Sequence, residues 1–448
     1  MDYFHYLCTM STLDPAIVKV LEKLKFTPNK MQEAALEASV NAHELILYSP
    51  TGSGKTLAFL LPLVTALKPS VHKVQALVVA PSRELVIQIE SVFKSMQTGL
   101  KVNTAYGGHS MRVEKLNMTE PPALLIGTPG RIADHIDRGT FDTTYLHTII
   151  LDEFDKSLEF GFSKEMGFIM RKLVGIKKKV LTSATEMKEI PSFTKIKSPK
   201  TLNFLADAEP IKLSIKKVLS PERDKLTTLY NLVCFTGNEA TLVFCNHREA
   251  TERISIYLNE MGVRNDAFHG GMEQGDREKI LAKFRNGSMQ LLVTTDLAAR
   301  GLDIPEIKFI IHYHLPSTEE QFTHRNGRTA RMNAKGTAFV IASVDEELPG
   351  YFDPNIPVFG LGKNLEKPEE PVWATLFIGG GKKDKINKVD IVGFLSKQGD
   401  LGKDDLGLIE VKDFFSYAAV KRKKIKHVLN KISSEKIKNK KVKFDLVE

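Results

Sequence analysis

Ser49–Thr56 reads SPTGSGKT and lies between the apolar run ELILY and the helical run LAFLLPLV. Gly52 and Gly54 let the backbone fold tightly, so that successive N–H groups point at phosphate oxygens. We expect Lys55 to neutralise the β- and γ-phosphates and Thr56 to place its hydroxyl on Mg²⁺. The alternative is an ordinary glycine-rich turn, but the strand–loop–helix setting favours a nucleotide phosphate site.

A pair of carboxylates follows a later apolar strand, in the run HTIILDEFD. Asp152 would hold Mg²⁺ and Glu153 would activate water, which are the two tasks that carboxylates perform beside a bound nucleotide. An isolated Asp–Glu pair is usually a solvated turn. Its place after a buried strand, downstream of Ser49–Thr56, instead predicts a catalytic site that uses ATP and Mg²⁺.

Length and composition limit the class of protein. The chain has 448 residues, 42% of them hydrophobic and 26% charged, which is typical of two or three globular domains. No apolar run approaches the ~20 residues that a transmembrane helix needs. Cys8, Cys234 and Cys245 are far apart and lack CxxC spacing, so neither a disulfide framework nor a zinc site is indicated. We expect a cytoplasmic protein with no membrane association.

Two blocks of apolar strands alternate with helices, which predicts two parallel-sheet α/β domains. After a proline-rich stretch, the chain changes to a βαββαβ order, which is the α+β plan of RNA-recognition modules. We place the hinge between the first two domains at Lys197–Pro210. The predicted boundaries are 1–205 and 206–348 for the α/β domains, 349–372 for a linker, and 373–448 for the last domain.

The net charge of +9 is concentrated at the end of the chain. Residues 417–448 hold eleven Lys or Arg against three Asp or Glu. A basic segment favours a polyanion such as nucleic acid or an acidic membrane surface, and the alternative is a solubilising tail.

LDEFD is followed thirty residues later by LTSAT, and at this point the sequence resembles the DEAD-box RNA helicases, with DEFD in place of DEAD. The resemblance covers about 330 residues, and the motifs fall in the family's order. It implies two tandem RecA-like domains, a P-loop NTPase core of helicase superfamily 2, and the activity of an ATP-dependent RNA helicase that hydrolyses ATP in response to RNA.

The resemblance also assigns expected roles to residues. Catalysis would use Lys55, Thr56, Asp152, Glu153, Arg328 and Arg331, with Thr56 and Asp152 as metal ligands. ATP would be bound by Gln32, Ser49, Pro50, Thr51, Gly52, Ser53, Gly54, Lys55, Thr56 and Asp303. Coupling between ATP and strand separation would use Asp155, Ser183, Ala184 and Thr185. RNA would contact Pro81, Ser82, Arg83, Gly107, Gly108, Thr128, Pro129, Gly130, Arg131, His269, Gly270, Gln274, Arg277 and Thr294.

Physical reasoning gives the arginines of HRNGRTAR a role in hydrolysis. Arg328 and Arg331 would reach the γ-phosphate only when the two domains close, and arginine fingers of this kind contribute about 10³–10⁵-fold in other NTPases. Asp303 would contact the ribose or order water nearby. Contacts to the RNA backbone carry little sequence information, so the core alone should not select its RNA.

The sequence departs from the family at several positions. Phe154 replaces the alanine of DEAD, Asn29 and Lys30 replace a Thr–Pro pair near Gln32, and Ala330 replaces a glycine of the arginine motif. These changes bear on the adenine selectivity and on the coupling of ATP to strand separation, whereas the residues of the ATPase chemistry are unchanged.

The last domain resembles the RNA-binding domain of the DbpA subgroup, which is RRM-like and acts on 23S ribosomal RNA during large-subunit assembly. The resemblance rests on GGGKKDK, the DIVGFL helix and the ending KIKNKKVKFDLV, although Asn387–Val389 replaces Arg-Pro-Gly. We expect Lys382, Lys383 and Arg422 to contact RNA phosphates. Phe415 and Tyr417 could stack on bases, but a half-buried core position is the favoured interpretation.

The leading hypothesis is therefore an RNA helicase that remodels structured RNA, with 23S ribosomal RNA or pre-50S particles as partners and no obligate protein partner evident. One alternative is an RNA-binding ribosome-assembly factor with weak or lost ATPase activity. Another is a DNA helicase of the wider superfamily, against which the DEFD, SAT and arginine motifs speak.

Overall fold

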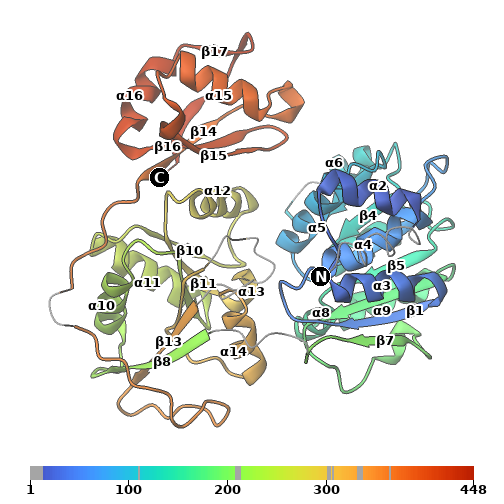
Figure 1. The fold of residues 1–448 in the computed structure, drawn as a ribbon, viewed down its shortest axis with the longest axis horizontal. Helices are drawn as coiled ribbons and strands as arrows, with labels where there is room; N and C mark the ends of the chain where they lie inside the picture. Colours follow the sequence, from blue (N-terminus) through green and yellow to red (C-terminus); the bar gives the residue numbers. More distant parts are fainter. Residues whose placement is uncertain are drawn as a thin grey trace. The chain divides into compact units, whose positions relative to one another are not determined.

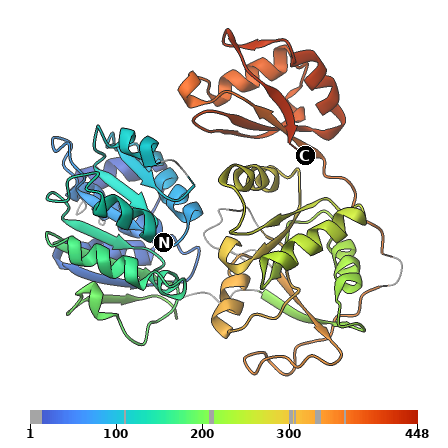
Figure 2. The same ribbon diagram turned by 180° about the vertical axis from the view of Figure 1, so that it is seen from behind.

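The computed structural model describes residues 14–108, 111–206, 213–299, 304, 307–329, 336–362 and 365–447. The chain forms two compact units, one built on residues before 207 and the other on residues after 212 (Figures 1 and 2). In the described part of the chain, no helix is both long and apolar enough to cross a lipid bilayer.

The first unit is a seven-stranded parallel sheet in the order β3-β4-β2-β5-β6-β1-β7. Its strands are β1 (Glu44–Tyr48), β2 (Ala76–Val79), β3 (Val102–Ala105), β4 (Leu124–Gly127), β5 (Thr148–Leu151), β6 (Lys178–Ser183) and β7 (Lys200–Asn203). Its helices are α2 (Pro15–Leu24), α3 (Lys30–Asn41), α4 (Lys55–Ala66), α5 (Arg83–Ser95), α6 (Met111–Asn117), α7 (Pro129–Asp137), α8 (Phe154–Glu159) and α9 (Ser163–Lys172).

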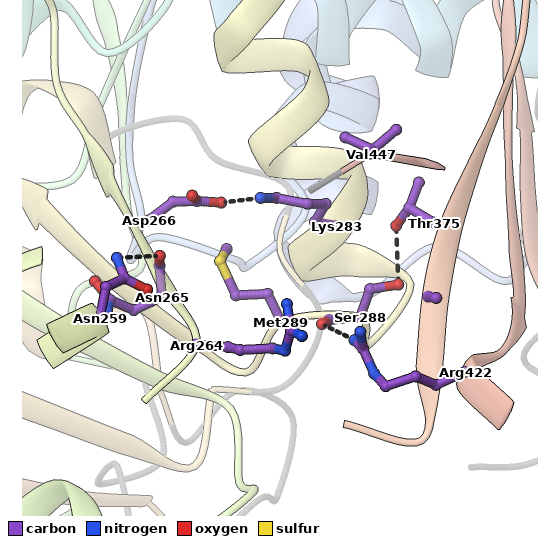
Figure 3. A pocket seen from close by; sticks show the side chains of 11 residues that line it. Asn259, Arg264, Asn265, Asp266, Lys283, Ser288, Met289, Thr375, Arg422 and Val447 are labelled. Atoms are coloured by element: carbon purple, nitrogen blue, oxygen red, sulfur yellow. Dashed lines mark hydrogen bonds and ion pairs between the residues drawn. The ribbon is translucent and has the colours of Figure 1, made fainter. Parts of the chain in front are cut away.

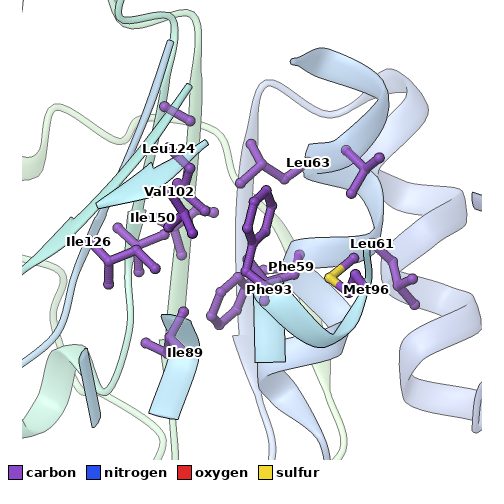
Figure 4. Packing of buried hydrophobic residues seen from close by; sticks show 14 of the residues in the cluster. Phe59, Leu61, Leu63, Ile89, Phe93, Met96, Val102, Leu124, Ile126 and Ile150 are labelled. Carbon is purple, nitrogen blue, oxygen red and sulfur yellow. The ribbon is translucent and has the colours of Figure 1, made fainter. Parts of the chain in front are cut away.

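Successive residues of each strand point to opposite faces of this sheet. Helices cover both faces, so both sets of side chains are buried. Ile126 of β4 and Ile150 of β5 pack with Phe59 of α4 and Phe93 of α5 in one apolar cluster (Figure 4). Their strand neighbours join a second cluster, with side chains of α7, α8 and α9. The continuous apolar strands of the sequence are explained by this double burial.

The second unit begins with a six-stranded parallel sheet in the order β10-β11-β9-β12-β13-β8. Its strands are β8 (Leu213–Ser220), β9 (Thr241–Cys245), β10 (Asn265–Phe268), β11 (Leu291–Thr295), β12 (Phe309–His312) and β13 (Gly336–Ser343). Its helices are α10 (Leu226–Thr236), α11 (Arg248–Glu260), α12 (Gln274–Arg285), α13 (Asp296–Ala299) and α14 (Glu319–Asn326).

The same unit ends in a four-stranded antiparallel sheet in the order β15-β16-β14-β19. The elements are β14 (Trp373–Ile378), α15 (Lys388–Lys397), β15 (Leu406–Val411), β16 (Ser416–Lys421), α16 (Arg422–Ile432), the short pair β17 (Lys436–Ile437) and β18 (Lys440–Lys441), and β19 (Phe444–Val447). The order βαββαβ is confirmed, with β17 and β18 inserted before the last strand. The predicted fold class is also confirmed: two RecA-like parallel-sheet domains are followed by an α+β domain.

Two segments expected to connect domains contain ordered structure. The proposed hinge Lys197–Pro210 includes β7, which pairs with β1, so this part of the segment belongs to the first sheet, and its residues 207–210 lie outside the described residues. The proposed linker 349–372 packs against the second parallel-sheet domain. Phe352 is 6% exposed, Phe359 packs on that domain's core, and Val358 forms a β-bridge with Lys217 of β8.

Candidate functional site

Three adjacent strands of the first sheet bring the predicted nucleotide residues together. β1 lies beside β6, and β6 lies beside β5. Because parallel strands all end at the same edge, the loop Ser49–Thr56 after β1, Asp152 after β5 and Ser183 at the end of β6 share one edge.

The loop Ser49–Thr56 has the backbone that a phosphate cradle needs. Gly52 and Gly54 have φ angles of 84° and 91°, which residues with a side chain rarely adopt. Gly54 caps helix α4, whose positive end faces this loop. Lys55 is 8% exposed, and its Nζ donates to the carbonyl oxygens of Ser49 at 2.6 Å and Pro50 at 2.8 Å.

Gln32 is held against this loop. Its Nε2 donates to the Gly54 carbonyl at 3.1 Å, and a Cβ on Gly54 would lie only 2.5 Å from that nitrogen. The Asn29 side chain accepts from Gln32 N at 3.0 Å and donates to the Ser53 carbonyl at 3.0 Å. Asn29 is thus a supporting residue that we missed, and its NKMQ capping-box pattern was the available signal.

Asp152 is a buried carboxylate, only 3% exposed. Burial and the neighbouring Glu153 raise its pKa to about 6. Thr182 on β6 donates its hydroxyl to Asp152 and accepts from the Glu153 N–H at 3.2 Å. Thr182, directly before the SAT motif, was not predicted to take part, although it fixes both acidic residues.

The DEFD and SAT motifs contact each other. Thr185 Oγ1 donates to Asp155 Oδ2 at 2.9 Å, and its N–H donates to Ser183 Oγ at 3.1 Å. Phe154 is fully buried in the apolar cluster beneath α8, where its ring centroid lies 6.2 Å from that of Phe193. The phenylalanine therefore fills core space, and the acidic residues around it keep their contacts.

The predicted RNA residues of the first domain gather along another part of the same edge. They follow the neighbouring strands β2, β4 and β3. Ser82 caps α5 and accepts from Leu85 N at 3.2 Å, and Thr128 caps α7, which begins with Pro129. Two helix N-termini therefore face this edge, and helix N-termini favour phosphate groups. Pro81 and Gly130 complete the two loops.

Contacts around Gly107 and Arg131 position two of the predicted arginines. A Cβ on Gly107 would lie 3.2 Å from Arg83 Nη2, so glycine permits the close approach that places this guanidinium beside Gly107–Gly108. Arg131 Nε donates to Glu114 Oε2 at 2.8 Å, and the buried His135 lies 2.6 Å from the same oxygen. Glu114 and His135 were missed, because no motif marks them.

In the second domain, the predicted RNA residues surround the end of β10. Arg277 Nη1 donates to the His269 carbonyl at 3.1 Å, and its guanidinium lies 4.6 Å from the Phe268 ring centre. Thr294 is fully buried and donates to the Phe268 carbonyl at 2.9 Å. Gly270 is exposed, whereas Gln274 at the start of α12 is 8% exposed. Thr294 is therefore buried and holds the end of β10 in place instead of facing RNA.

The arginine motif contains a buried anchor that we did not predict. Arg325 is 1% exposed and forms two hydrogen bonds of 2.7 Å to Asp296. It also donates to the His314 carbonyl and the Asn246 side chain, each at 2.8 Å. Arg325 thus fixes α14 against the segment after β11, and Arg328 follows one turn later. Arg331, Asp303 and Ala330 lie outside the described residues.

In the last domain, Lys382 and Lys383 are exposed on a short turn, close to the β17–β18 hairpin, where Lys440 pairs with Asp384 at 3.0 Å. The guanidinium of Arg422, which we expected to contact an RNA phosphate, instead donates to backbone carbonyl oxygens. Its Nε donates to the Pro371 carbonyl at 2.7 Å, and its Nη2 donates to the Trp373 carbonyl at 2.7 Å. Burial, then the nearby Arg264, lower its pKa.

Comparison with known proteins agrees with this architecture. Residues 29–192 match the family described as DEAD/DEAH box helicase, residues 224–333 match the helicase conserved C-terminal domain, and residues 375–446 match the DbpA RNA binding domain. The chain is 31% identical to the ATP-dependent RNA helicase DbpA of Bacillus subtilis (strain 168), over 96% of this chain and 97% of that relative. The chain belongs to the DEAD-box helicase family.

Other relatives place this DEAD-box helicase in the DbpA type. DbpA of Escherichia coli (strain K12) is 32% identical over 96% of this chain and 97% of that relative. Among solved structures, S. cerevisiae Dbp5 bound to RNA and ADP BeF3 has a TM-score of 0.66 at 25% identity, covering 74% of this chain and 88% of that one. Mss116p bound to ssRNA and AMP-PNP has a TM-score of 0.68 at 26% identity, covering 76% and 74%. The protein is an ATP-dependent RNA helicase with an RNA-binding C-terminal domain.

Proposed function

We propose that this helicase remodels structured ribosomal RNA, in 23S RNA or pre-50S particles, during assembly of the large ribosomal subunit. The observation that carries the proposal is the C-terminal domain at residues 375–446, which matches the DbpA RNA binding domain and follows a core with its nucleotide motifs in place. The two DbpA relatives, from Bacillus subtilis and Escherichia coli, align with this chain along nearly their full length.

In the proposed mechanism, the loop Ser49–Thr56 and the helix behind it bind the phosphates of ATP, with Lys55 as the cation. Gln32 supports the loop through Gly54, and to read the adenine its amide would exchange the hydrogen bonds that it makes with Asn29 N and the Gly54 carbonyl. Glu153 takes the proton of the attacking water. Arg328 and Arg331 of the second domain stabilise charge that develops on the γ-phosphate.

Thr56 and Asp152 are suited to hold Mg²⁺. Magnesium prefers oxygen ligands such as carboxylates and hydroxyls. The Asp152 carboxylate is buried with its pKa raised to about 6, so a nearby cation would relieve the cost of keeping it ionised. Bound Mg²⁺ would neutralise charge on the phosphate oxygens.

RNA binding is proposed along the strand ends that carry Ser82, Gly107 and Thr128 in the first domain and Gly270 in the second. These groups offer hydroxyls and N–H donors, which suit the sugar–phosphate backbone and do not distinguish sequence. Selection of the target is therefore assigned to the C-terminal domain, with Lys382 and Lys383 as phosphate contacts.

Steady-state ATP hydrolysis tests this proposal. The rate is measured without RNA, with poly(U), and with purified 23S ribosomal RNA at equal nucleotide concentration. We expect 23S RNA to stimulate hydrolysis at far lower concentration than poly(U). Equal stimulation by both RNAs would contradict the ribosomal target and leave a general RNA helicase. Absence of hydrolysis in all three conditions would favour the alternative function, an assembly factor that binds RNA and has lost its ATPase.

A further inference from the structure

The C-terminal sheet has one face that its own helices do not cover. Leu376 and Ile378 of β14 and Ala418 of β16 point into the core beneath α15 and α16. Strand geometry turns the alternate residues to the opposite face. This face carries Trp373, Thr375 and Phe377 of β14, with Tyr417 and Ala419 of β16. In RNA-recognition modules the corresponding open face stacks on bases.

Much of this face is buried by the second parallel-sheet domain. Thr375 and Ala419 are fully buried, and Tyr417 is 2% exposed. Helix α12 contacts β14, and both views show it beside the C-terminal sheet. Burial, then Glu278 of α12, raise the pKa of the Tyr417 hydroxyl.

The turn that follows α12 forms a closed set of hydrogen bonds with Thr375. Thr375 Oγ1 donates to Ser288 Oγ at 2.8 Å (Figure 3). Asn286 Nδ2 donates to Thr375 Oγ1 at 2.8 Å, and Ser288 Oγ donates to Asn286 Oδ1 at 2.6 Å. All three side chains are buried. Neutral hydrogen bonds between buried groups are directional and little affected by salt, so they fix the orientation of the two domains.

The same turn contacts the only tryptophan of the chain. Gly287 has a φ of 75°, and a Cβ on it would lie 3.3 Å from Trp373 Cδ1. On the other side, a Cβ on Gly407 of β15 would lie 3.4 Å from Trp373 Cδ2. Two glycines, one from each domain, therefore make room for the indole.

Charged groups flank the hydrogen-bonded centre. Arg285 Nη1 donates to both carboxylate oxygens of Glu410, at 3.0 and 2.8 Å. Although burial raises the pKa of Glu410, Arg285 and Lys412 outweigh it and the net pKa is lowered. Arg422 Nη2 donates to the Ser288 carbonyl at 3.1 Å. A small cavity of about 140 Å³ beside Arg422 is also lined by Lys283 and Asp266, which form an ion pair at 2.6 Å.

The segment that precedes β14 is also anchored. Phe359 packs on the core of the second domain, and the ammonium of Lys216 lies 4.9 Å from its ring centre. Closer to the C-terminal domain, Arg264 Nη2 donates to Glu370 Oε1 at 2.9 Å. These contacts hold both described parts of the segment, before and after residues 363–364, against the second parallel-sheet domain.

We propose that this contact, which we call the docking surface (Arg285–Ser288 with Trp373, Thr375, Glu410 and Arg422), joins the C-terminal domain rigidly to the second domain and determines which RNA is unwound. RNA bound by the C-terminal domain is then presented to the core at one distance and orientation. The covered part of the sheet contacts the second parallel-sheet domain, so RNA binds the turn that carries Lys382 and Lys383 instead. The RNA part of this inference rests on the proposed function.

The first readout of the test needs no RNA, because Trp373 reports on docking by its own fluorescence. Arg285→Glu and Glu410→Arg each place like charges together, and Thr375→Arg inserts a long side chain into the contact. We expect all three to shift Trp373 emission to longer wavelength and to increase its quenching by acrylamide. The double variant R285E/E410R should restore the wild-type spectrum. Lys308→Glu, which breaks a half-exposed ion pair with Glu239 elsewhere in this unit, should leave the spectrum unchanged.

The second readout is the RNA preference of the same full-length variants. Undocked variants should bind 23S RNA with wild-type affinity and keep their poly(U)-stimulated ATPase. Their preference for 23S RNA over poly(U) should fall about tenfold, because a loosely held RNA visits the core at lower effective concentration. R285E/E410R should regain the preference.

Each outcome has a separate meaning. Unchanged Trp373 fluorescence in all three single variants would overturn the docking surface itself. Altered fluorescence with an unchanged 23S preference would overturn its role in RNA selection. If the wild-type protein shows no 23S preference at all, the proposed function fails, while the fluorescence result still decides whether the domains are docked.

Discussion

Glu153 adopts a left-handed backbone, with φ of 45° and ψ of 53°, which costs about 1–2 kcal/mol for a residue other than glycine. Its N–H donates to the hydroxyl of Thr182 on β6, and this hydroxyl donates to Asp152. These hydrogen bonds hold the strained backbone of Glu153 in place. Strained backbones are common at active sites, where the surrounding structure holds them in place. The local geometry thus supports Glu153 as a functional residue.

Glu153→Gln should separate binding from hydrolysis. The amide keeps the size of the side chain and the backbone contacts, but it cannot take a proton from water. We expect ATP and RNA to remain bound together while turnover falls by about 10²–10⁴-fold, as measured by single-turnover hydrolysis and RNA retention. Glu159→Gln, which alters a carboxylate paired with Lys156 on the same helix, should retain turnover. Normal hydrolysis in Glu153→Gln would remove its assignment as the base.

Phe154→Ala tests whether the DEFD variation affects coupling or packing. The ring is fully buried among apolar side chains of α7, α8 and α9, and its removal leaves a cavity. We expect the free energy of unfolding to fall by about 3–5 kcal/mol, measured by urea denaturation. The ATPase rate per folded molecule at low temperature should change little. An unchanged free energy of unfolding, combined with altered stimulation of the ATPase by RNA, would show that Phe154 instead couples RNA binding to ATP hydrolysis.

At the scale of elements, the central strands could be predicted and the edge strands could not. The apolar runs ELILY, ALVVA, ALLIG, TIILD and KVLTS located β1, β2, β4, β5 and β6 in the first sheet, and TLVFC, QLLVTT, KFIIHYH and GTAFVIAS located β9, β11, β12 and β13 in the second. The four missed strands, β3, β7, β8 and β10, are the outer strands of their sheets. Edge strands have one unpaired side and need less apolar sequence, as VNTA of β3 and NDAF of β10 illustrate. Periodicity alone therefore finds the buried centre of a parallel sheet.

Glu44 joins two of these elements and gives a pH-dependent prediction. Its carboxylate accepts from Lys197 N at 2.8 Å, Ser198 N at 3.0 Å and Lys179 Nζ at 2.9 Å, which fixes β1 to the segment before β7. Burial raises its pKa, but these donors outweigh burial and lower the pKa from 4.5 to about 2. The stabilisation is therefore complete above pH 4.5 and is lost as the pH falls towards 2.

Glu44→Gln should lower the free energy of unfolding at pH 7 by about 1 kcal/mol, because the neutral amide accepts weaker hydrogen bonds. Thermal unfolding at a series of pH values measures the difference from wild type. This difference should shrink as the pH falls from about 4.5 towards 2, because the unfolded chain takes up a proton at Glu44 at a higher pH than the folded protein does. Glu90→Gln, in an exposed pair with Lys94 on α5, should change the Tm little. A pH-independent difference would contradict the role of the charge.

At the scale of the whole molecule, the sequence located three domains but not their contacts. Asn286 and Thr375 are 89 positions apart, and nothing in either local sequence marks the hydrogen bond between them. Arg422 illustrates the same limit, since a basic run predicts phosphate contacts while its guanidinium binds carbonyl oxygens at a domain boundary. Motifs locate chemistry that is local in the chain, whereas docking depends on complementary surfaces that only the fold creates.

Deletion of residues 373–448 should separate the generic activity from target selection. Among the described residues, the core cluster of the second parallel-sheet domain extends to Leu361, so the truncated protein should fold, with one side of α12 and the turn after it newly exposed. We expect its poly(U)-stimulated ATPase to persist and its preference for 23S RNA to disappear. Its RNA affinity should also depend less steeply on salt, because each lost phosphate contact lowers the slope of log K against log salt by about one unit. Filter binding at several salt concentrations measures this, and a truncated core with the full preference and slope would place RNA selection within the two parallel-sheet domains.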